Sequence, residues 1–269
     1  AVIRSRKYLS EAGVCSRREA DKLIAAGQVT VDGVRAETGM KVEPWQVVRI
    51  GKKQVSRQEE MIVLAVNKPR GIVCTEERRE RDSIVRFLNY PVRITYVGRL
   101  DKDTEGLLLI TDDGQLAHQL LSPKKHVDKT YFAVTEGKVV PEDIEKIRLG
   151  VDIGDEEPTL PGKLEILRTW KEDADRKNVE GESGAVIANS NAAGHKADPE
   201  GSIWCSEILL TIHEGRFHQV KRMMEAVGKK VIYLKRISMG ALTLPDDLPK
   251  GKARELTPDE LAALKCENS

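Results

Sequence analysis

The amino-acid sequence predicts an α+β fold with two domains of unequal size. Two short helical patterns, followed by a run of alternating apolar and polar residues, occupy the first fifty positions. Beyond them, strand-like apolar runs and helical patterns are mixed without regular alternation, which favours α+β over a doubly wound parallel sheet. At roughly 150 residues per domain, a chain of 269 residues holds one large domain or two unequal ones.

The N-terminal region predicts two helices and a small sheet. Residues 5–13 place apolar side chains on one helical face, and a glycine ends the pattern. A capping box that begins at Ser16 opens a second helix over residues 16–27. Residues 28–53 then alternate apolar and polar side chains, with an Asp-Gly hairpin turn at 32–33.

The rest of the chain predicts a larger domain over residues 61–269, joined by a polar linker at 54–60. Apolar runs typical of strands cover 61–69, 94–100, 106–111, 129–136, 163–170, 207–215 and 229–237. Helical patterns cover 141–150, 217–228 and 257–265.

Residues 171–202 differ from their surroundings in composition. They are rich in Gly, Ala, Asn, Ser and acidic residues, contain few large apolar side chains and carry a net charge of −3. Such a segment buries too little apolar surface to order itself. We therefore predict a disordered insertion between two strands of the larger domain.

The distribution of charge is more informative than its sum. The whole chain carries +1, yet residues 1–57 carry +6 and the remainder carries −5. A basic N-terminal segment on a mildly acidic body is an asymmetry typical of a domain that contacts nucleic acid.

Several function classes are excluded by absent patterns. No apolar run of about 18 residues is present, so we expect no membrane span, and the first residues lack a signal-peptide pattern. The four cysteines are scattered without a CxxC pair, which fits a reduced cytoplasmic setting. No Walker A, GxGxxG or GxSxG motif occurs, and His213 and His218 lack a third ligand at metal spacing, so we expect neither cofactor nor metal.

Four segments carry chemistry-bearing residues. Residues 97–114 hold an acidic loop between two apolar runs, with Asp101, Asp103 and Glu105 in it. Three of these positions fit a calcium-loop template, but the flanks read as strands rather than helices, so we reject calcium. The other segments are NKPRG at 67–71, KTY at 129–131 and HEGRFHQVKRM at 213–223.

These segments, in this order, resemble a known family. GRLDKDTEGLLLITDDG is similar to the central motif of the RsuA/RluB/RluF-type ribosomal RNA pseudouridine synthases, and NKPRG, KTY and EGRFHQVKRMMEAVG resemble three further motifs of that family. RKYLSEAGVCSRREADKLIAAGQVTVDG resembles the alpha-L RNA-binding domain that precedes their catalytic domain. The resemblance spans nearly the whole chain, apart from the insertion.

The resemblance implies a fold and an activity. The fold is an αα-β RNA-binding domain at 1–53 and a catalytic domain at 61–269, built on a mixed, mainly antiparallel sheet with flanking helices. The activity is the isomerisation of uridine to pseudouridine in ribosomal RNA. It needs no outside energy or electron carrier, because the product is an isomer.

The resemblance also implies roles for four individual residues. Asp101 matches the aspartate that acts at the anomeric carbon, as nucleophile or as base. Tyr131 stacks on the target base, and Lys221 pairs with Asp101 and keeps it ionised. The family often carries Arg where Lys221 stands, so this chain keeps the charge but loses the fork geometry. Arg99 fills the gap left by the flipped nucleotide or holds its phosphate.

Further basic residues are predicted to contact RNA. In the N-terminal domain, Arg17, Arg18 and Lys22 cluster on one helix and are expected to bind phosphates. The predicted RNA-binding residues of the catalytic domain are Lys68, Arg216 and Arg222. For Asp103 and Glu105 we expect hydrogen bonding within the loop rather than catalysis.

The RNA target stays open at this point. Residues 10–21 and 79–88 look closer to the branch that acts on the large subunit (23S), whereas FHQVKRM looks closer to the small-subunit (16S) branch. We predict 23S rRNA and a monomeric enzyme, with 16S rRNA as the alternative. A non-catalytic RNA-binding protein of ribosome assembly is a further alternative, disfavoured because the Asp101 loop is complete.

Overall fold

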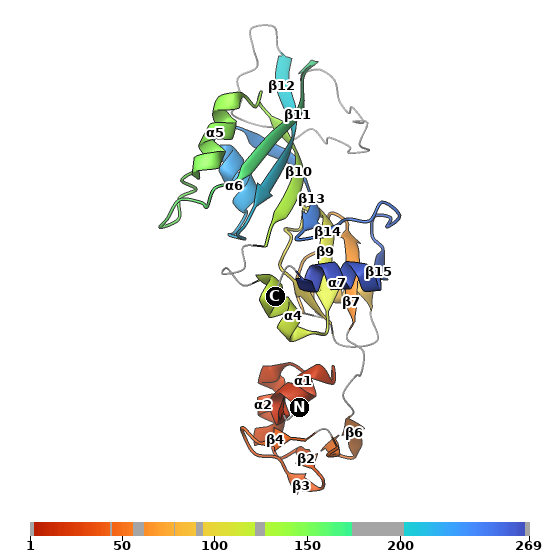
Figure 1. The fold of residues 1–269 in the computed structure, drawn as a ribbon. Coiled ribbons are helices and arrows are strands. Elements are labelled where there is room, and N and C mark those ends of the chain that lie inside the picture. Colours follow the sequence, from red (N-terminus) through yellow and green to blue (C-terminus); the bar gives the residue numbers. More distant parts are fainter. Residues whose placement is uncertain are drawn as a thin grey trace.

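The computed structural model describes residues 3–43, 45–55, 62–77, 79–89, 94–121, 127–173 and 202–266 (Figure 1). Most of the predicted linker and of the predicted insertion lies outside these ranges. No described helix is long and apolar enough to cross a membrane.

The N-terminal domain consists of two helices and two small sheets. The helices are α1 (Ser5–Glu11) and α2 (Arg17–Ala25). A two-stranded sheet pairs β1 (Ile3–Arg4) with β4 (Lys41–Val42). A four-stranded sheet in the order β3-β2-β5-β6 contains β2 (Val29–Val31), β3 (Val34–Arg35), β5 (Val48–Ile50) and β6 (Lys53–Val55). Strand β6 carries this domain two residues beyond the predicted boundary at 53.

Local sequence explains the helix start and the hairpin. The Ser16 side chain accepts a hydrogen bond from the Glu19 amide at 3.1 Å, and the Ser16 amide donates back to the Glu19 carboxylate at 2.7 Å. The β2–β3 turn has positive φ at both Asp32 (50°) and Gly33 (82°), which Asp-Gly pairs tolerate. Both predicted features are confirmed.

The catalytic domain is built on a nine-stranded mixed sheet. Its path runs β11-β12-β10-β13-β9-β7-β15, with β8 paired to β9 and β14 to β13. Every pairing is antiparallel except β9 with β13. The strands are β7 (Val63–Lys68), β8 (Thr95–Val97), β9 (Glu105–Thr111), β10 (Lys129–Glu136), β11 (Lys163–Asp173), β12 (Ser202–Ile212), β13 (Lys230–Met239), β14 (Leu242–Thr243) and β15 (Ala253–Glu255).

The helices of this domain cover both faces of the sheet (Figure 1). They are α3 (Ile84–Leu88), α4 (Gly114–Leu121), α5 (Pro141–Leu149), α6 (Gln219–Ala226) and α7 (Pro258–Cys266). Leu108 of β9 belongs to a core cluster that includes Met223 of α6, while its neighbour Leu109 packs in a second cluster with Leu120 of α4. Strand β9 is therefore buried on both faces, which explains its unbroken apolar sequence.

The two strands that flank the predicted insertion are longer than expected. Asp173 of β11 pairs with Ser202 of β12. Residues 171–173 and 202 therefore belong to strands, and the insertion was predicted too wide. Only 174–201 fall outside the described residues. The helices α3 and α4, which have five and eight residues, were not predicted from the sequence.

The close approach of β9 and β13 brings the loop before β9 next to β13. Gly106 pairs with Arg236 in the only parallel contact of the described strands, at a φ of +99°. A Cβ at position 106 would lie 2.2 Å from the Arg236 carbonyl oxygen. Only glycine allows β13 to pass this close to the acidic loop that precedes β9.

Candidate active site

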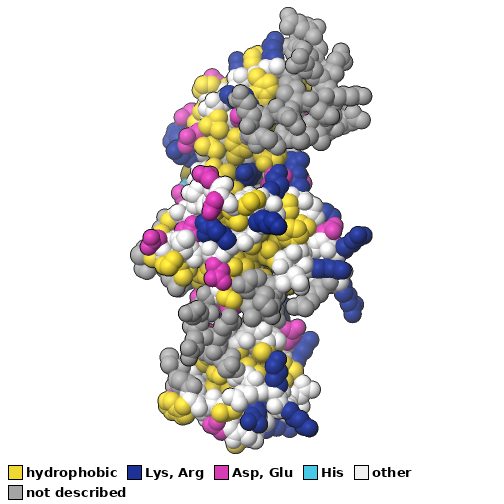
Figure 2. Space-filling model, turned by 90° about the vertical axis from the view of Figure 1, so that its right-hand side faces the viewer, with side chains coloured by type: hydrophobic (Ala, Val, Ile, Leu, Met, Phe, Trp, Pro, Cys, Tyr) yellow, Lys and Arg dark blue, Asp and Glu magenta, His cyan; other side chains and the backbone are white. Residues whose placement is uncertain are grey.

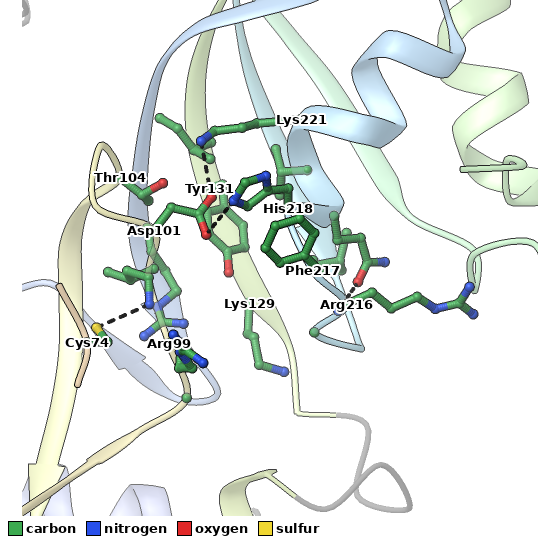
Figure 3. A pocket seen from close by; sticks show the side chains of 18 of the residues that line it. Cys74, Arg99, Asp101, Thr104, Lys129, Tyr131, Arg216, Phe217, His218 and Lys221 are labelled. Atoms are coloured by element: carbon green, nitrogen blue, oxygen red, sulfur yellow. Dashed lines mark hydrogen bonds and ion pairs between the residues drawn. The ribbon is translucent and has the colours of Figure 1, made fainter. Parts of the chain in front are cut away.

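A cavity of about 660 Å³ opens where the loop between β8 and β9 meets β10, β13 and the start of α6 (Figure 3). Its lining includes Asp101 from the loop, Tyr131 from β10, Arg236 from β13, and His218 and Lys221 from the α6 segment. Residues from four distant parts of the sequence thus share one pocket.

A buried lysine holds the loop that carries Asp101. The Lys68 side chain is fully buried, and its Nζ donates to the carbonyl oxygens of Asp101 (3.0 Å), Thr104 (2.7 Å) and Pro69 (3.1 Å). Burial lowers the pKa of Lys68. The prediction that Lys68 binds RNA is wrong, because its ammonium group lies beneath the loop and is saturated by backbone carbonyls.

One lysine stands between two carboxylates at the top of the cavity. Lys221 Nζ lies 3.1 Å from Asp101 Oδ2 and 2.7 Å from Asp103 Oδ1. Burial opposes the charged form of Lys221, but the hydrogen bonds to Asp103 and Asp101 outweigh it and raise its pKa. Partial burial likewise opposes ionisation of Asp103, yet the Lys221 hydrogen bond lowers its pKa. Lys221 and Asp103 are therefore charged at neutral pH. The carboxylate of Asp103 shares the lysine with Asp101, a contact that we did not predict.

The segment before α6 adds an aromatic pair that was also missed. His218 has the left-handed backbone conformation (φ 48°) and places its Nε2 3.5 Å from Asp101 Oδ1. The Phe217 ring stacks on it at a centroid distance of 3.7 Å and is 74% exposed. The signal was present in the sequence, since both residues lie in the predicted helix over 217–228 that carries Lys221. The structure begins α6 two residues later than predicted, at Gln219.

The opposite side of the cavity is cationic. Tyr131 is buried and has Arg236 as its cross-strand partner on β13. Lys129 is buried as well, and its Nζ donates to the Val127 carbonyl at 2.9 Å. Arg99 is exposed at the rim. Figure 3 shows Arg99 and Lys129 on the side of Tyr131 away from Lys221. The pocket therefore joins a paired carboxylate at one side to several cations at the other.

Arg216 and Arg222 donate hydrogen bonds to backbone carbonyls of the same chain. Arg216 donates to the carbonyl oxygens of Glu157 (2.6 Å) and Pro158 (2.9 Å). Arg222 donates to the carbonyl oxygen of Ile153 at 3.1 Å and pairs with Asp155. The two side chains fasten the loop between α5 and β11 to α6. Most donors of both side chains are therefore occupied within the chain, which argues against the predicted role in RNA binding, although Arg216 also lines the cavity.

Glu105 is a structural residue of the loop. Its carboxylate accepts from the Tyr233 hydroxyl at 2.9 Å and pairs with Lys250 at 3.0 Å. It is 4% exposed. Burial, followed by this hydrogen bond, raises the pKa of Tyr233. Glu105 therefore ties the end of the loop to β13 and to the segment before β15.

The basic helix of the N-terminal domain faces solvent. Arg17, Arg18 and Lys22 are all exposed, and no ion pair among the described residues involves them. Figure 2 shows Lys and Arg side chains on the surface of this domain, at the bottom of the view. No group of three or more His, Cys, Asp or Glu side chains within the described ranges is arranged to hold a metal ion.

A pocket of this kind, beside a separate basic domain, is typical of an enzyme that acts on a nucleic acid. The family described as RNA pseudouridylate synthase matches residues 62–226, and the S4 domain matches residues 6–58. The chain belongs to the RNA pseudouridylate synthase family, and it is an RNA pseudouridine synthase with an N-terminal S4 domain. The mixed, mainly antiparallel sheet and its flanking helices confirm the predicted α+β fold.

Full-length relatives agree with this family. Ribosomal large subunit pseudouridine synthase B of Bacillus subtilis is 38% identical over 266 residues, covering 98% of this chain and 96% of the relative. Ribosomal small subunit pseudouridine synthase A of Yersinia pestis is 33% identical over 262 residues, covering 96% of each. A crystal structure described as a pseudouridylate synthase superimposes with a TM-score of 0.63 at 31% identity, covering 97% of this chain and 99% of that one.

Proposed function

We propose that this enzyme converts uridine to pseudouridine in ribosomal RNA, and that its target lies in the 23S rRNA of the large subunit. The observation that carries the proposal is the pairing of Asp101 with Lys221 beside the buried Tyr131. Full-length similarity to two ribosomal synthases supports rRNA as the substrate.

The reaction is an isomerisation. The bond between ribose C1′ and uracil N1 breaks, a bond between C1′ and uracil C5 forms, the C5 proton leaves to water and N1 gains a proton. Asp101 acts at C1′ as nucleophile or as base. The carboxylate is suited to either role, because the Lys221 ammonium group lies 3.1 Å from it and holds it in place at the cavity. No cofactor is needed, since no electrons or groups are exchanged with another molecule.

The other residues of the pocket orient the nucleotide. Tyr131 is proposed to stack on the flipped uracil and to assist proton transfer at C5. Arg99, exposed at the rim, fills the gap that the extruded base leaves in the RNA or holds its phosphate. Because extruding a base costs a few kcal/mol, contacts outside the pocket must supply binding energy. Arg17, Arg18 and Lys22 are proposed to provide it through phosphate contacts.

The large-subunit assignment rests on sequence. The relative that acts on the large subunit is 38% identical and the small-subunit one 33%, and residues 10–21 and 79–88 also look closer to the large-subunit branch. The FHQVKRM segment favours a 16S target, which we keep as the second candidate. We further propose that the enzyme works as a monomer in the cytoplasm, where ribosomal RNA is made.

The activity is tested with unmodified 23S and 16S transcripts that carry tritium at uracil C5. The wild-type protein is expected to release tritium from one of them, and Asp101→Asn is expected to abolish release. No release from either transcript by the wild-type protein, or full activity of Asp101→Asn, contradicts the proposal.

The target is tested separately by mapping pseudouridine in both rRNAs from a strain that lacks the gene. We expect one pseudouridine to disappear from 23S rRNA and to return when the wild-type gene is restored. A loss confined to 16S rRNA shows that the second candidate is right.

A further inference from the structure

Arg236 is a buried cation whose hydrogen bonding is incomplete. It is 1% exposed and lines the cavity. Its Nε donates to the Leu107 carbonyl at 2.8 Å, but its Nη2 is buried without a hydrogen-bond partner. No carboxylate among the described residues forms an ion pair with it. Because a guanidinium stays charged at every physiological pH, leaving such a group unsatisfied destabilises the folded protein.

Other buried or half-buried cations of this domain do have partners. Lys68 donates to the backbone carbonyls of Pro69, Asp101 and Thr104 at 3.1 Å or less. Arg222 donates to the Ile153 carbonyl and pairs with the Asp155 carboxylate. Arg254 also has an unbonded Nε, yet it forms an ion pair with Glu260 at 2.8 Å. Arg236 differs from them in having a buried donor without a hydrogen-bond partner and no carboxylate paired with it among the described residues.

The strand pairing of Arg236 places its side chain beside Tyr131. Arg236 and Tyr131 are opposite each other on β13 and β10, so their side chains project from the same face with Cβ atoms about 4.5–5.5 Å apart. The contact with Gly106 fixes the backbone of Arg236, and the Leu107 carbonyl aims its guanidinium. Lys129 lies near enough that burial, and then the charge of Arg236, lower the pKa of Lys129. The guanidinium is therefore held beside the tyrosine on which the uracil is proposed to stack.

We propose that Arg236 binds an anionic oxygen of the flipped nucleotide, and that this oxygen belongs to the uracil ring. This inference rests on the proposed function. When the C1′–N1 bond breaks, its electron pair stays on the uracil, and the negative charge spreads onto the O2 and O4 carbonyls. A fixed cation in a site with little water stabilises this charge as it develops. A phosphate is the other source of anionic oxygen, but the depth of Arg236 beside Tyr131 favours the base.

The test compares Arg236→Gln and Arg236→Lys with the wild-type enzyme, using tritium release from the rRNA transcript that the wild type modifies. Arg236→Gln is expected to lower kcat about 10²-fold, with the Kd for RNA changed less than threefold. Arg236→Lys keeps the charge and is expected to lose less. Lys235→Gln, one residue away on β13 and not part of the cavity lining, is the matched control and should keep the wild-type kcat.

A second substrate separates the two sources of the anion. A transcript made with 5-fluorouridine carries a more acidic base, which leaves more readily. Its rearranged nucleoside is measured by digestion and chromatography in single-turnover reactions. If Arg236 stabilises the departing base, the defect of Arg236→Gln shrinks about tenfold on this RNA. An unchanged defect together with a raised KM assigns the contact to a phosphate and overturns the base assignment.

Wild-type kcat and KM in both variants overturn the proposal altogether. Should Arg236→Gln fail to fold, the Arg236→Lys variant decides, since a reduced kcat supports the contact and a wild-type kcat contradicts it. A failure of the proposed function has a different signature, because the wild-type enzyme then releases no tritium from either transcript.

Discussion

The basic residues of the two domains differ in what they contact. In the N-terminal domain, Arg17, Arg18 and Lys22 are exposed and form no ion pair within the described residues. In the catalytic domain, the side chains of Lys68 and Arg222 donate hydrogen bonds to backbone carbonyls of the same domain. Two sets of residues that look alike in the sequence therefore have different tasks. One set faces solvent, and the other holds loops of the catalytic domain in place.

This comparison predicts that cations of the catalytic domain affect turnover or stability, whereas those of the N-terminal domain affect affinity. The following variants test that division.

The largest effect is expected at Lys221. Replacing it with Met removes the cation that lies between Asp101 and Asp103, so we expect kcat to fall about 10²-fold or more with little change in RNA affinity. Lys221→Arg keeps the charge and should stay within about tenfold of the wild type. Because the pKa of Lys221 is raised, wild-type activity should not decline between pH 7 and 9 through loss of this charge. An unchanged kcat in Lys221→Met would remove it from the mechanism.

Lys68→Met should reduce both stability and turnover. The change leaves the carbonyls of Asp101, Thr104 and Pro69 without their buried donor, which destabilises the fold by about 2 kcal/mol. For a domain of this size we expect Tm to fall by roughly 4–8 °C, and kcat to fall because the Asp101 loop is loosened. Lys102→Met is the control, since that side chain is exposed and pairs only with Asp82 among the described residues. A loss of RNA affinity without a loss of stability would restore the original RNA-binding role of Lys68.

The N-terminal basic residues are tested together. Changing Arg17, Arg18 and Lys22 to Ala should weaken RNA binding and reduce the slope of log K against log salt by up to about 2–3. The kcat at saturating RNA should change less. The matched control is Arg216→Ala with Arg222→Ala, which removes basic residues that bind their own chain and should leave the salt slope unchanged. Equal slopes in the wild type and the triple variant would contradict the division between the two domains.

The smallest effect is expected at the C-terminal helix. The hydrogen bond from Arg254 lowers the pKa of Glu260 to about 2. Glu260 therefore stabilises the folded state above the pKa of an unfolded glutamate, about 4.3, and this contribution is lost as pH falls towards 2. Arg254→Met should lower Tm slightly at pH 6, and the difference from the wild type should shrink between pH 4.5 and 2. A constant difference over this range would show that the ion pair contributes nothing.

Most helices and strands could be predicted from the sequence, but the contacts of the Lys and Arg side chains in the catalytic domain could not. The capping box at Ser16 and the turn at Asp32 and Gly33 are set by local geometry, so a local pattern was enough to find them. Whether a basic side chain faces water or a backbone carbonyl depends on contacts across the fold. Lys68 meets the Asp101 carbonyl 33 positions away, and Arg222 meets Ile153 at a separation of 69. No local pattern carries that information.

The same reasoning applies to the candidate site. The loop around Asp101 and the segment around Lys221 stood out by composition. Arg236 did not, because it lies in an ordinary strand. It is recognised only from Tyr131 across the sheet and from its buried donor without a hydrogen-bond partner.

The separation of these partners along the chain also sets the time that a ribosome needs to synthesise all of them. Lys221 and Asp103 are 118 positions apart, and Arg236 follows still later. A ribosome that adds 5–20 residues per second needs roughly 7–27 s to progress from the Asp101 loop to Arg236. Until α6 is made, the aspartate lacks its lysine, and until β13 is made and paired, the pocket lacks Arg236. A growing chain therefore holds its whole N-terminal domain well before it holds the complete pocket, and the synthesis of Arg236 sets the earliest time at which that pocket can form.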